Sequence, residues 1–146
     1  MRMNQVTLPA RDYHASVAFY DRLGLRQIVA APPRYARFEC DDGATLSLHV
    51  SDEMESGSGV VVYFEVDQLD ELVATLKAKG FAFISDPRDE RWLWREARLR
   101  DPFGNQICLY HAGQNRRFPP WRIVDQDHGR SPDAPTSELS GKLSGP

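Results

Sequence analysis

The first 111 residues of this chain read as two copies of one short unit, and this duplication constrains the fold more than any other feature. Each copy opens on a strand-like segment and an aspartate, continues through a helix-like stretch to a glycine, and closes on a glycine turn and a strand. Matching landmarks lie 55 to 61 residues apart: Asp12 with Asp67, Gly24 with Gly80, and Gly43 with Gly104. Because such a unit cannot bury its own sheet face alone, two must pair, and a ligand site is expected at their seam.

Composition narrows the class of protein. A length of 146 residues fits one domain, or two half-domains sharing a core, plus a tail. A hydrophobic content of 41% and a charged content of 27% are ordinary for a soluble globular protein. The net charge of −3 gives no electrostatic footprint for nucleic acid or an anionic membrane, so neither is expected as a partner. No apolar run near the start resembles a signal peptide and none is long enough to span a membrane, so we expect a cytoplasmic protein.

The hydrophobic periodicity predicts the elements of each unit. Alternation of apolar and polar residues, as at Val6 and Leu8, indicates strands at 4–9, 26–30, 35–40 and 44–50 in the first unit. The same pattern indicates strands at 60–66, 81–84, 92–100 and 105–111 in the second unit. Apolar stripes at helical spacing predict one helix in each unit, with Asp12 and Asp67 as the capping residues.

Two segments lie beyond the duplicated units. In residues 114–124, Phe118 and Trp121 flank a rigid Pro-Pro pair, and we expect them to dock onto this subunit or onto a neighbour. Residues 125–146 carry few apolar side chains, so we expect a disordered tail. The two cysteines, Cys40 and Cys108, sit in separate units without Cys-x-x-Cys spacing, which argues against a disulfide framework.

The order βαβββ–βαβββ, with Ser16-x-x-Phe19-Tyr20 in the first half and Arg100-Asp101-Pro102-Phe103-Gly104-Asn105 in the second, resembles the vicinal oxygen chelate (VOC) superfamily. That superfamily includes the glyoxalase, bleomycin-resistance and extradiol dioxygenase proteins. The resemblance covers residues 3–111, and the Asp-Pro-x-Gly-Asn turn is its most specific mark. It implies an α+β fold in which two tandem βαβββ modules, 3–50 and 59–111, form a curved mixed-sheet cleft within a VOC domain spanning 1–113.

We also expect a homodimer. Since one fold of this kind hosts isomerases, thiol transferases, dioxygenases and binding proteins, function has to be argued from the site.

Strand alternation predicts which side chains line the cleft. If the apolar positions face the helices, the intervening positions face the opposite side of the sheet. The predicted ligand-binding residues on that side are Gln5, Arg37, Ser47, Tyr63, Trp94, Arg98, Cys108 and Tyr110. Two interpretations of the charged members stay open: a pocket for a polar ligand, or solvated ion pairs between strands that involve Arg37, Glu39, Glu96 and Arg98.

The resemblance also implies where a metal would bind. The positions that match the ligands of metal-dependent members are Gln5, Ser47, Val61 and Cys108. Ser47 is a poor ligand, Val61 has no donor atom, and a soft thiolate beside an amide oxygen does not suit a hard octahedral ion. We therefore predict no metal cofactor. The alternative route is a site rebuilt from displaced ligands on the same face: His49, Glu65, Glu96 and Tyr110.

Two functions from different classes follow. The first is an enzyme that transfers a proton next to a carbonyl, or opens a ring, with His49 and Glu96 as the acid/base pair and Arg98 or Arg37 holding negative charge. The second is a protein of the bleomycin-resistance type, which sequesters a small polar or anionic, partly aromatic molecule without a metal. Cys108 could serve as a nucleophile only if a charge such as that of Arg98 lowers its pKa; otherwise it is an inert, half-buried thiol.

Overall fold

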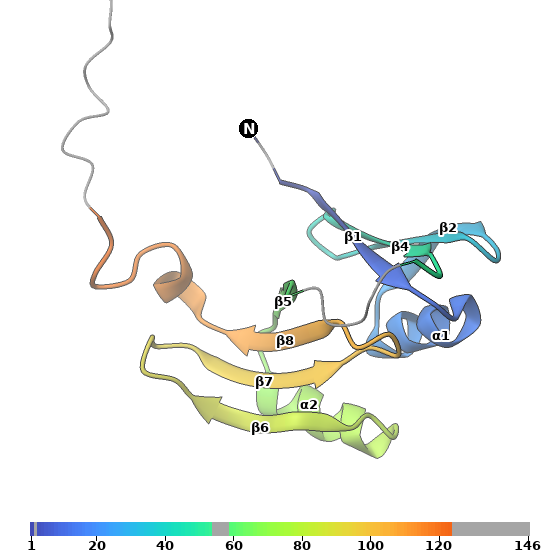
Figure 1. Ribbon diagram of the computed structural model, residues 1–146. Coiled ribbons are helices and arrows are strands. Elements are labelled where there is room, and N and C mark those ends of the chain that lie inside the picture. The colour runs from blue at the N-terminus through green and yellow to red at the C-terminus, as the bar shows by residue number, and fades with distance from the viewer. Residues whose placement is uncertain (2, 54–58, 124–146) are drawn as a thin grey trace, which may run out of the picture.

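Two four-stranded mixed sheets and two helices make up the fold, as a computed structural model that describes residues 1, 3–53 and 59–123 shows (Figure 1). The predicted tail, 125–146, lies outside the described residues. The first module comprises β1 (Gln5–Ala10), α1 (Tyr13–Leu23), β2 (Arg26–Ala31), β3 (Tyr35–Glu39) and β4 (Thr45–Val50). The second comprises β5 (Val61–Glu65), α2 (Leu69–Ala78), β6 (Phe83–Asp89), β7 (Arg95–Arg100) and β8 (Gln106–His111), followed by a 3-10 turn, η1 (Gly113–Arg116).

The two sheets have the same topology, which confirms the predicted duplication and the α+β class. Their strand orders are β1-β4-β3-β2 and β5-β8-β7-β6, and in each sheet the first strand runs parallel to the fourth while the other pairs are antiparallel. A parallel pair requires a long crossover, and the helix together with the two intervening strands supplies it. Helix α1 packs on β2, β3 and β4, and α2 packs on β6, β7 and β8.

One hydrophobic core joins the two modules. It contains the helix-facing residues of both sheets, among them Leu8, Leu46, Leu48, Leu99, Ile107 and Leu109, each no more than 2% exposed. These are the positions that alternation assigned to the helix side. At the module boundary, Phe19 of α1 meets Phe81 edge-on with ring centroids 5.2 Å apart. Among the described residues, no helix has the length and apolar character that a membrane span requires.

A buried carboxylate connects the modules at the turn between β7 and β8. Asp101 is 5% exposed, and its Oδ2 accepts hydrogen bonds from the Tyr20 hydroxyl and the Asn105 side-chain amide, both at 2.7 Å. Its Oδ1 accepts from the backbone N–H groups of Phe103 and Asn105. The Asn105 amide also donates to the Pro9 carbonyl oxygen of β1 at 2.9 Å. The Asp-Pro-x-Gly-Asn turn therefore holds α1 and β1 of the first module against the second.

The predicted start of the first helix is confirmed, and that of the second is wrong. The Asp12 side chain accepts from the Ala15 N–H at 2.9 Å and caps α1. Helix α2 begins instead after Gln68, which makes no side-chain capping bond. The carboxylates of Asp70 and Glu71 in the first turn supply the negative charge that favours a helix N-terminus, so a capping carboxylate before Gln68 is not needed there.

The strands of the β6–β7 hairpin differ from the predicted ranges. Strand β6 continues to Asp89, and residues 90–94 form a turn rather than the start of the next strand. Leu93 in this turn has φ = 67°, a left-handed conformation that is uncommon for a bulky residue. No glycine or asparagine marks this turn, and the alternating pattern therefore placed the start of the second strand too early, at residue 92.

Replacing Asp101 with Ala should reduce the free energy of unfolding by roughly 3 kcal/mol or more, because four donors would lose a buried acceptor together. Urea denaturation followed by circular dichroism measures the change. Asp86→Ala is the matched control: its pair with Lys77 is exposed, so its loss should cost less than about 1 kcal/mol. Equal effects of the two substitutions would show that Asp101 does not hold the modules together.

Candidate functional site

The candidate site lies on the face of the second sheet that points away from α2. Strand register places residues from three strands side by side on this face: Tyr63, Cys108 and Arg98 in one row, and Glu65, Tyr110 and Glu96 in the next. The alternate residues, such as Ile107 and Leu109, enter the core, so their neighbours along each strand must face outward.

Three aromatic rings gather at the centre of this face. Trp94 and Tyr110 stack with ring centroids 4.6 Å apart and an interplanar angle of 21°. Tyr63 stands nearly perpendicular to both, at 6.0 Å from Trp94 and 5.8 Å from Tyr110. We call these three residues the aromatic triad. Tyr63 is 45% exposed although it belongs to the triad, so part of the aromatic surface stays available to a ligand.

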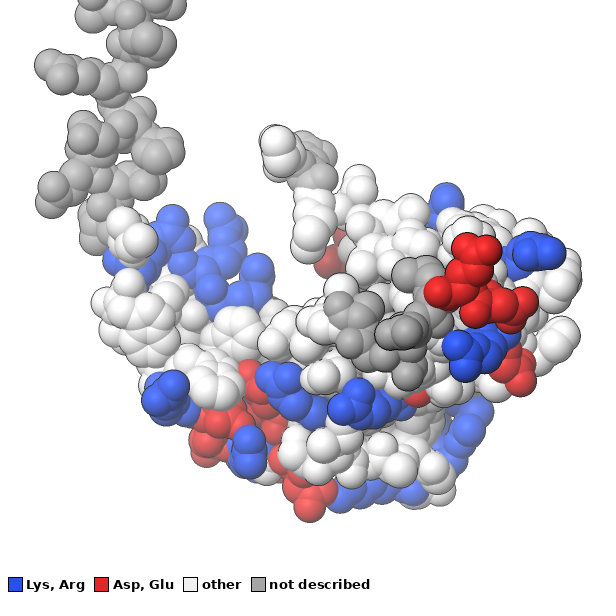
Figure 2. Space-filling view, viewed as in Figure 1, with Lys and Arg blue, Asp and Glu red and all other residues white. Residues whose placement is uncertain are grey.

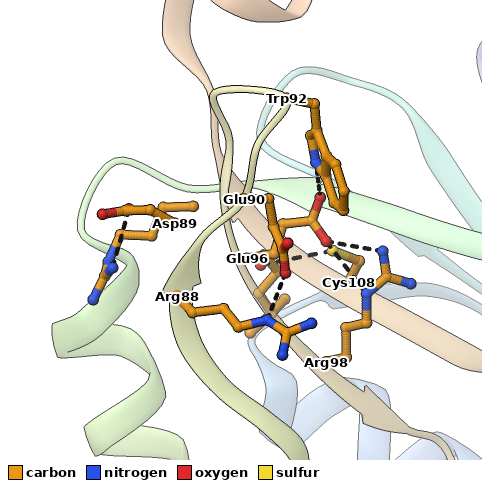
Figure 3. A network of polar contacts seen from close by, with 9 residues as sticks. Arg88, Asp89, Glu90, Trp92, Glu96, Arg98 and Cys108 are labelled. Carbon is orange, nitrogen blue, oxygen red and sulfur yellow. Dashed lines mark hydrogen bonds and ion pairs between the residues drawn. The ribbon is translucent and has the colours of Figure 1, made fainter.

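A buried ion pair adjoins the triad. Glu96 is only 3% exposed, and one of its oxygens accepts from Arg98 Nη2 at 2.8 Å while the other accepts from Trp92 Nε1 at 2.6 Å (Figure 3). The Arg98 guanidinium lies 5.8 Å from the centre of the Tyr63 ring. Burial disfavours the charge of Arg98, but hydrogen bonds with Glu96 and Tyr63 outweigh it and raise the pKa. Arg98 is thus a fixed, protonated cation at the edge of the triad.

Cys108 lies on β8, next to Arg98 in the sheet. It lies between Arg98 and Tyr63 in the row, and its small side chain leaves space for the guanidinium to reach the tyrosine ring. Burial, reinforced by the negative charge of Glu96, raises the pKa of the Cys108 thiol to about 12, although Arg98 acts in the opposite direction. Cys108 is therefore a protonated, buried thiol rather than a nucleophile.

Glu65 closes the other end of the face. Its Oε1 accepts from the backbone N–H groups of Ala112 at 3.2 Å and Gly113 at 2.8 Å. Its Oε2 contacts the Tyr110 hydroxyl at 3.5 Å and pairs with Arg116 Nε at 3.3 Å. Burial and the Glu65 charge raise the pKa of Tyr110 to about 12, so this hydroxyl remains a donor.

The remaining predicted residues lie on the first sheet and form a separate group. Ser47 is buried and shares a 2.7 Å hydrogen bond with Thr7, while Arg37 Nε donates to the Tyr35 hydroxyl at 2.8 Å. Gln5 accepts from the Thr45 hydroxyl at 3.0 Å, and His49 is exposed on β4. The predicted residues that come together are thus Tyr63, Trp94, Glu96, Arg98, Cys108 and Tyr110. The acid/base pairing of His49 with Glu96 stays a prediction, and the two residues lie on different sheets.

Two contributors to the site were not among the predicted site residues. Trp92 reaches Glu96 because the turn at 90–94 bends it back over the sheet, and no turn residue in the sequence signals that bend. Arg116 follows the last strand and joins the site through Glu65, which was named only as a displaced metal ligand. A basic residue close after a strand is too common a pattern to have indicated this contact.

Comparison with known proteins agrees with this architecture. The family model described as "Glyoxalase/Bleomycin resistance protein/Dioxygenase superfamily" matches residues 2–109. The chain belongs to this superfamily. No match was found among curated protein sequences.

Several solved structures of superfamily proteins are similar to this chain. A glyoxalase/bleomycin resistance protein/dioxygenase from Nocardioides has a TM-score of 0.70 at 25% identity, covering 85% of this chain and 90% of that one. A bleomycin-binding protein complexed with bleomycin has a TM-score of 0.63 at 23% identity, covering 76% and 98%. A lactoylglutathione lyase from Agrobacterium tumefaciens has a TM-score of 0.66 at 21% identity, covering 80% and 97%. The last two show a shared fold only.

The donor groups of this superfamily member do not fit a metal. Val61 offers no donor atom, the Ser47 hydroxyl is engaged by Thr7, and Cys108 is a buried, soft sulfur donor. Of the displaced candidates, Glu65 and Glu96 already pair with Arg116 and Arg98. Within residues 1, 3–53 and 59–123, no three His, Cys, Asp or Glu side chains are grouped so that they could hold an ion.

We accordingly expect protein expressed in metal-rich medium to purify with far less than one divalent ion per chain, as elemental analysis would measure. Close to one Ni, Zn, Mn or Fe per chain would contradict this. His49→Ala would then separate the two metal models, because loss of that ion on substitution would support the displaced-ligand route.

Cys108 should resist alkylation by iodoacetamide at pH about 8 in the folded protein and react once the protein is unfolded in urea. Glu96→Gln should lower the pH at which alkylation of Cys108 reaches half its maximum rate, because removing a negative charge favours the thiolate. Mass spectrometry of the modified peptide gives both results. Rapid alkylation of Cys108 in the folded wild type would show that it is an activated thiol.

Proposed function

We propose that this protein binds a small molecule with an aromatic part and an anionic group on the second sheet, and that it sequesters the molecule without a metal. The observation that supports this best is the aromatic triad beside a fixed arginine. Tyr63, which is 45% exposed, and the partly exposed Trp94 offer ring surface for stacking, while the buried Tyr110 stacks on Trp94 and supports it. Arg98 lies 5.8 Å from the centre of the Tyr63 ring. An anionic aromatic ligand would use both features at once.

Glu96 makes Arg98 suitable for binding an anion. Without it, a long arginine side chain would lose conformational entropy on meeting the ligand. The contacts of Arg98 with Glu96 at 2.8 and 3.3 Å already hold the guanidinium in place, and Trp92 fixes the carboxylate in turn. The side chain of Arg98 is still 30% exposed, so it can be reached from solvent.

The proposal that the ligand is bound but not chemically changed agrees with the state of the two potentially reactive groups, Cys108 and Glu96. Burial raises the pKa of the Cys108 thiol, and both oxygens of the Glu96 carboxylate already accept hydrogen bonds, from Trp92 and Arg98. The alternative function is the predicted enzyme in which His49 and Glu96 exchange protons with a carbonyl compound. Its signature would be chemical change of a bound carbonyl ligand, which nuclear magnetic resonance of the ligand would detect.

We also propose that the working form is a homodimer. Tyr63 on the binding face is 45% exposed in a single chain, and Phe118 and Trp121 are each 58% exposed rather than docked on their own subunit. Exposed aromatic residues of this size are costly to leave in water. A neighbouring subunit would provide the surface that residues 114–124 were predicted to cover.

The aromatic half of the proposal is tested with biphenyl monosulfonate, a planar-ringed monoanion, by isothermal titration calorimetry. Trp94→Ala should weaken binding by about tenfold, in line with the loss of a stacking face worth about 0.5–1.5 kcal/mol and of contact area. Tyr35→Ala is a matched control because it removes a half-buried ring from the first sheet, outside the triad. An unchanged affinity in Trp94→Ala would contradict the assignment of the site.

The arginine half needs a paired design, because removing Arg98 alone would leave the Glu96 carboxylate buried without a cation. The comparison is therefore between Glu96→Gln and the double variant Glu96→Gln/Arg98→Gln. The double variant should bind biphenyl monosulfonate about 10- to 150-fold more weakly than the single one, since one hydrogen bond to a charged group is worth about 1.5–3 kcal/mol. Arg26→Gln, at an exposed pair on the first sheet, should leave affinity unchanged.

A further inference from the structure

Three arginines cluster just after the last strand. Arg116 ends η1, and Arg117 and Arg122 lie over the ring of Phe118 at 5.5 and 4.7 Å. These residues belong to the group of basic side chains near the described C-terminal end in Figure 2. Among the described residues, no ion pair involves Arg117 or Arg122, whereas Arg116 pairs with Glu65. This segment therefore carries excess positive charge.

Glu65 connects this cluster directly to the aromatic triad. One of its oxygens lies 3.5 Å from the Tyr110 hydroxyl and 3.3 Å from Arg116 Nε. The other oxygen fixes the backbone at Ala112 and Gly113, where the chain leaves the sheet. Glu65 therefore connects Tyr110, the backbone at Ala112 and Gly113, and Arg116.

A cationic group therefore adjoins each of the two rows that carry Tyr63 and Tyr110. Arg98 contacts Tyr63 in one row of the sheet, and the next row, two residues or roughly 7 Å along the strands, ends at Glu65 on the outer strand. Arg116 lies beyond Glu65. A molecule stacked on the triad would have Arg98 at one end and the arginine segment at the other.

The surface beside the arginine segment, residues 116–122, has a hollow. Arg116 and Arg117 line a hollow of about 750 Å³ whose opposite side is formed by Met3, Asn4 and the turn at 42–44 (Figure 2). The hollow is open to solvent, so a polar group can enter it from outside. Asp42 also lines the hollow, but no ion pair joins it to either arginine among the described residues. A second anionic group could enter here without displacing protein atoms from Arg117.

From this arrangement we infer that the ligand is an elongated aromatic dianion, with one anionic group at Arg98 and a second at Arg116 and Arg117. This inference rests on the proposed function, because it takes the aromatic triad as the centre of the site. It adds that charge at both ends of the ligand is recognised. Two cations held apart by an aromatic surface discriminate against molecules that carry a single anionic end.

The test compares biphenyl monosulfonate with biphenyl disulfonate, which carries a sulfonate at each far end, by isothermal titration calorimetry at constant ionic strength. The wild type should bind the disulfonate about tenfold or more tightly, as expected for one added charge-assisted contact. Arg117→Gln should reduce that preference several-fold, because it removes one of the two cations assigned to the second anionic group. Arg122→Gln, in the same segment but outside the lining of the hollow, should retain the preference.

The outcomes separate the two proposals. Equal affinity of the wild type for both probes, or a preference that survives in both Arg117→Gln and Arg116→Gln/Arg117→Gln, overturns the dianion inference while leaving the aromatic site in place. Binding of neither probe, or monosulfonate binding that Trp94→Ala does not weaken, overturns the proposed function and this inference with it. These arginines are outside the core, so the variants should fold, and their melting temperatures would verify this.

Discussion

The whole arrangement depends on one buried carboxylate, that of Asp101. A charge in a protein interior is tolerated only when hydrogen bonds satisfy it, and here a phenol, an amide and two backbone N–H groups do so. Burial and the nearby carboxylate raise the pKa of Tyr20, which keeps its hydroxyl a donor to Asp101. Since Tyr20 comes from one module and Asn105 from the other, the network requires both modules in a fixed relation. The relative placement of the two sheets follows from that relation.

The two faces of the second sheet differ in character: one faces the helices and enters the shared core, and the other carries the polar and aromatic groups of the candidate site. The helix-facing residues of both modules form one large apolar cluster, and Cys108, Tyr110 and Ala112 form a second, smaller buried cluster on the outer face of the second sheet. That face can hold a buried glutamate, an arginine and three aromatic rings because its hydrogen bonds are completed locally. Cys108 is buried like a core residue although it lies on the outer face, between Arg98 and Tyr63 in the strand register.

The sequence predicted the elements and the two faces of each sheet well, because both depend on local periodicity. The capping role of Asp12 and the helix-facing position of Ile107 both follow from spacing along the chain. The failures have a different origin. Leu93 adopts a left-handed conformation without glycine, so the turn that carries Trp92 had no local signal. Which of the inward side chains would meet depended on long-range geometry, and that geometry placed His49 on a different sheet from most of the predicted site.

The turn at residues 90–94 is a place where substitutions could change the candidate site. Trp92 is carried by a turn outside both helices and outside the shared core, yet its indole N–H reaches the carboxylate that orients Arg98. Substitutions in that turn could therefore alter which charge the sheet face presents while the folding of both modules stays the same. The contact that orients Arg98 and the shared core are thus encoded in different parts of the chain, so sequence change in the turn need not disturb the core.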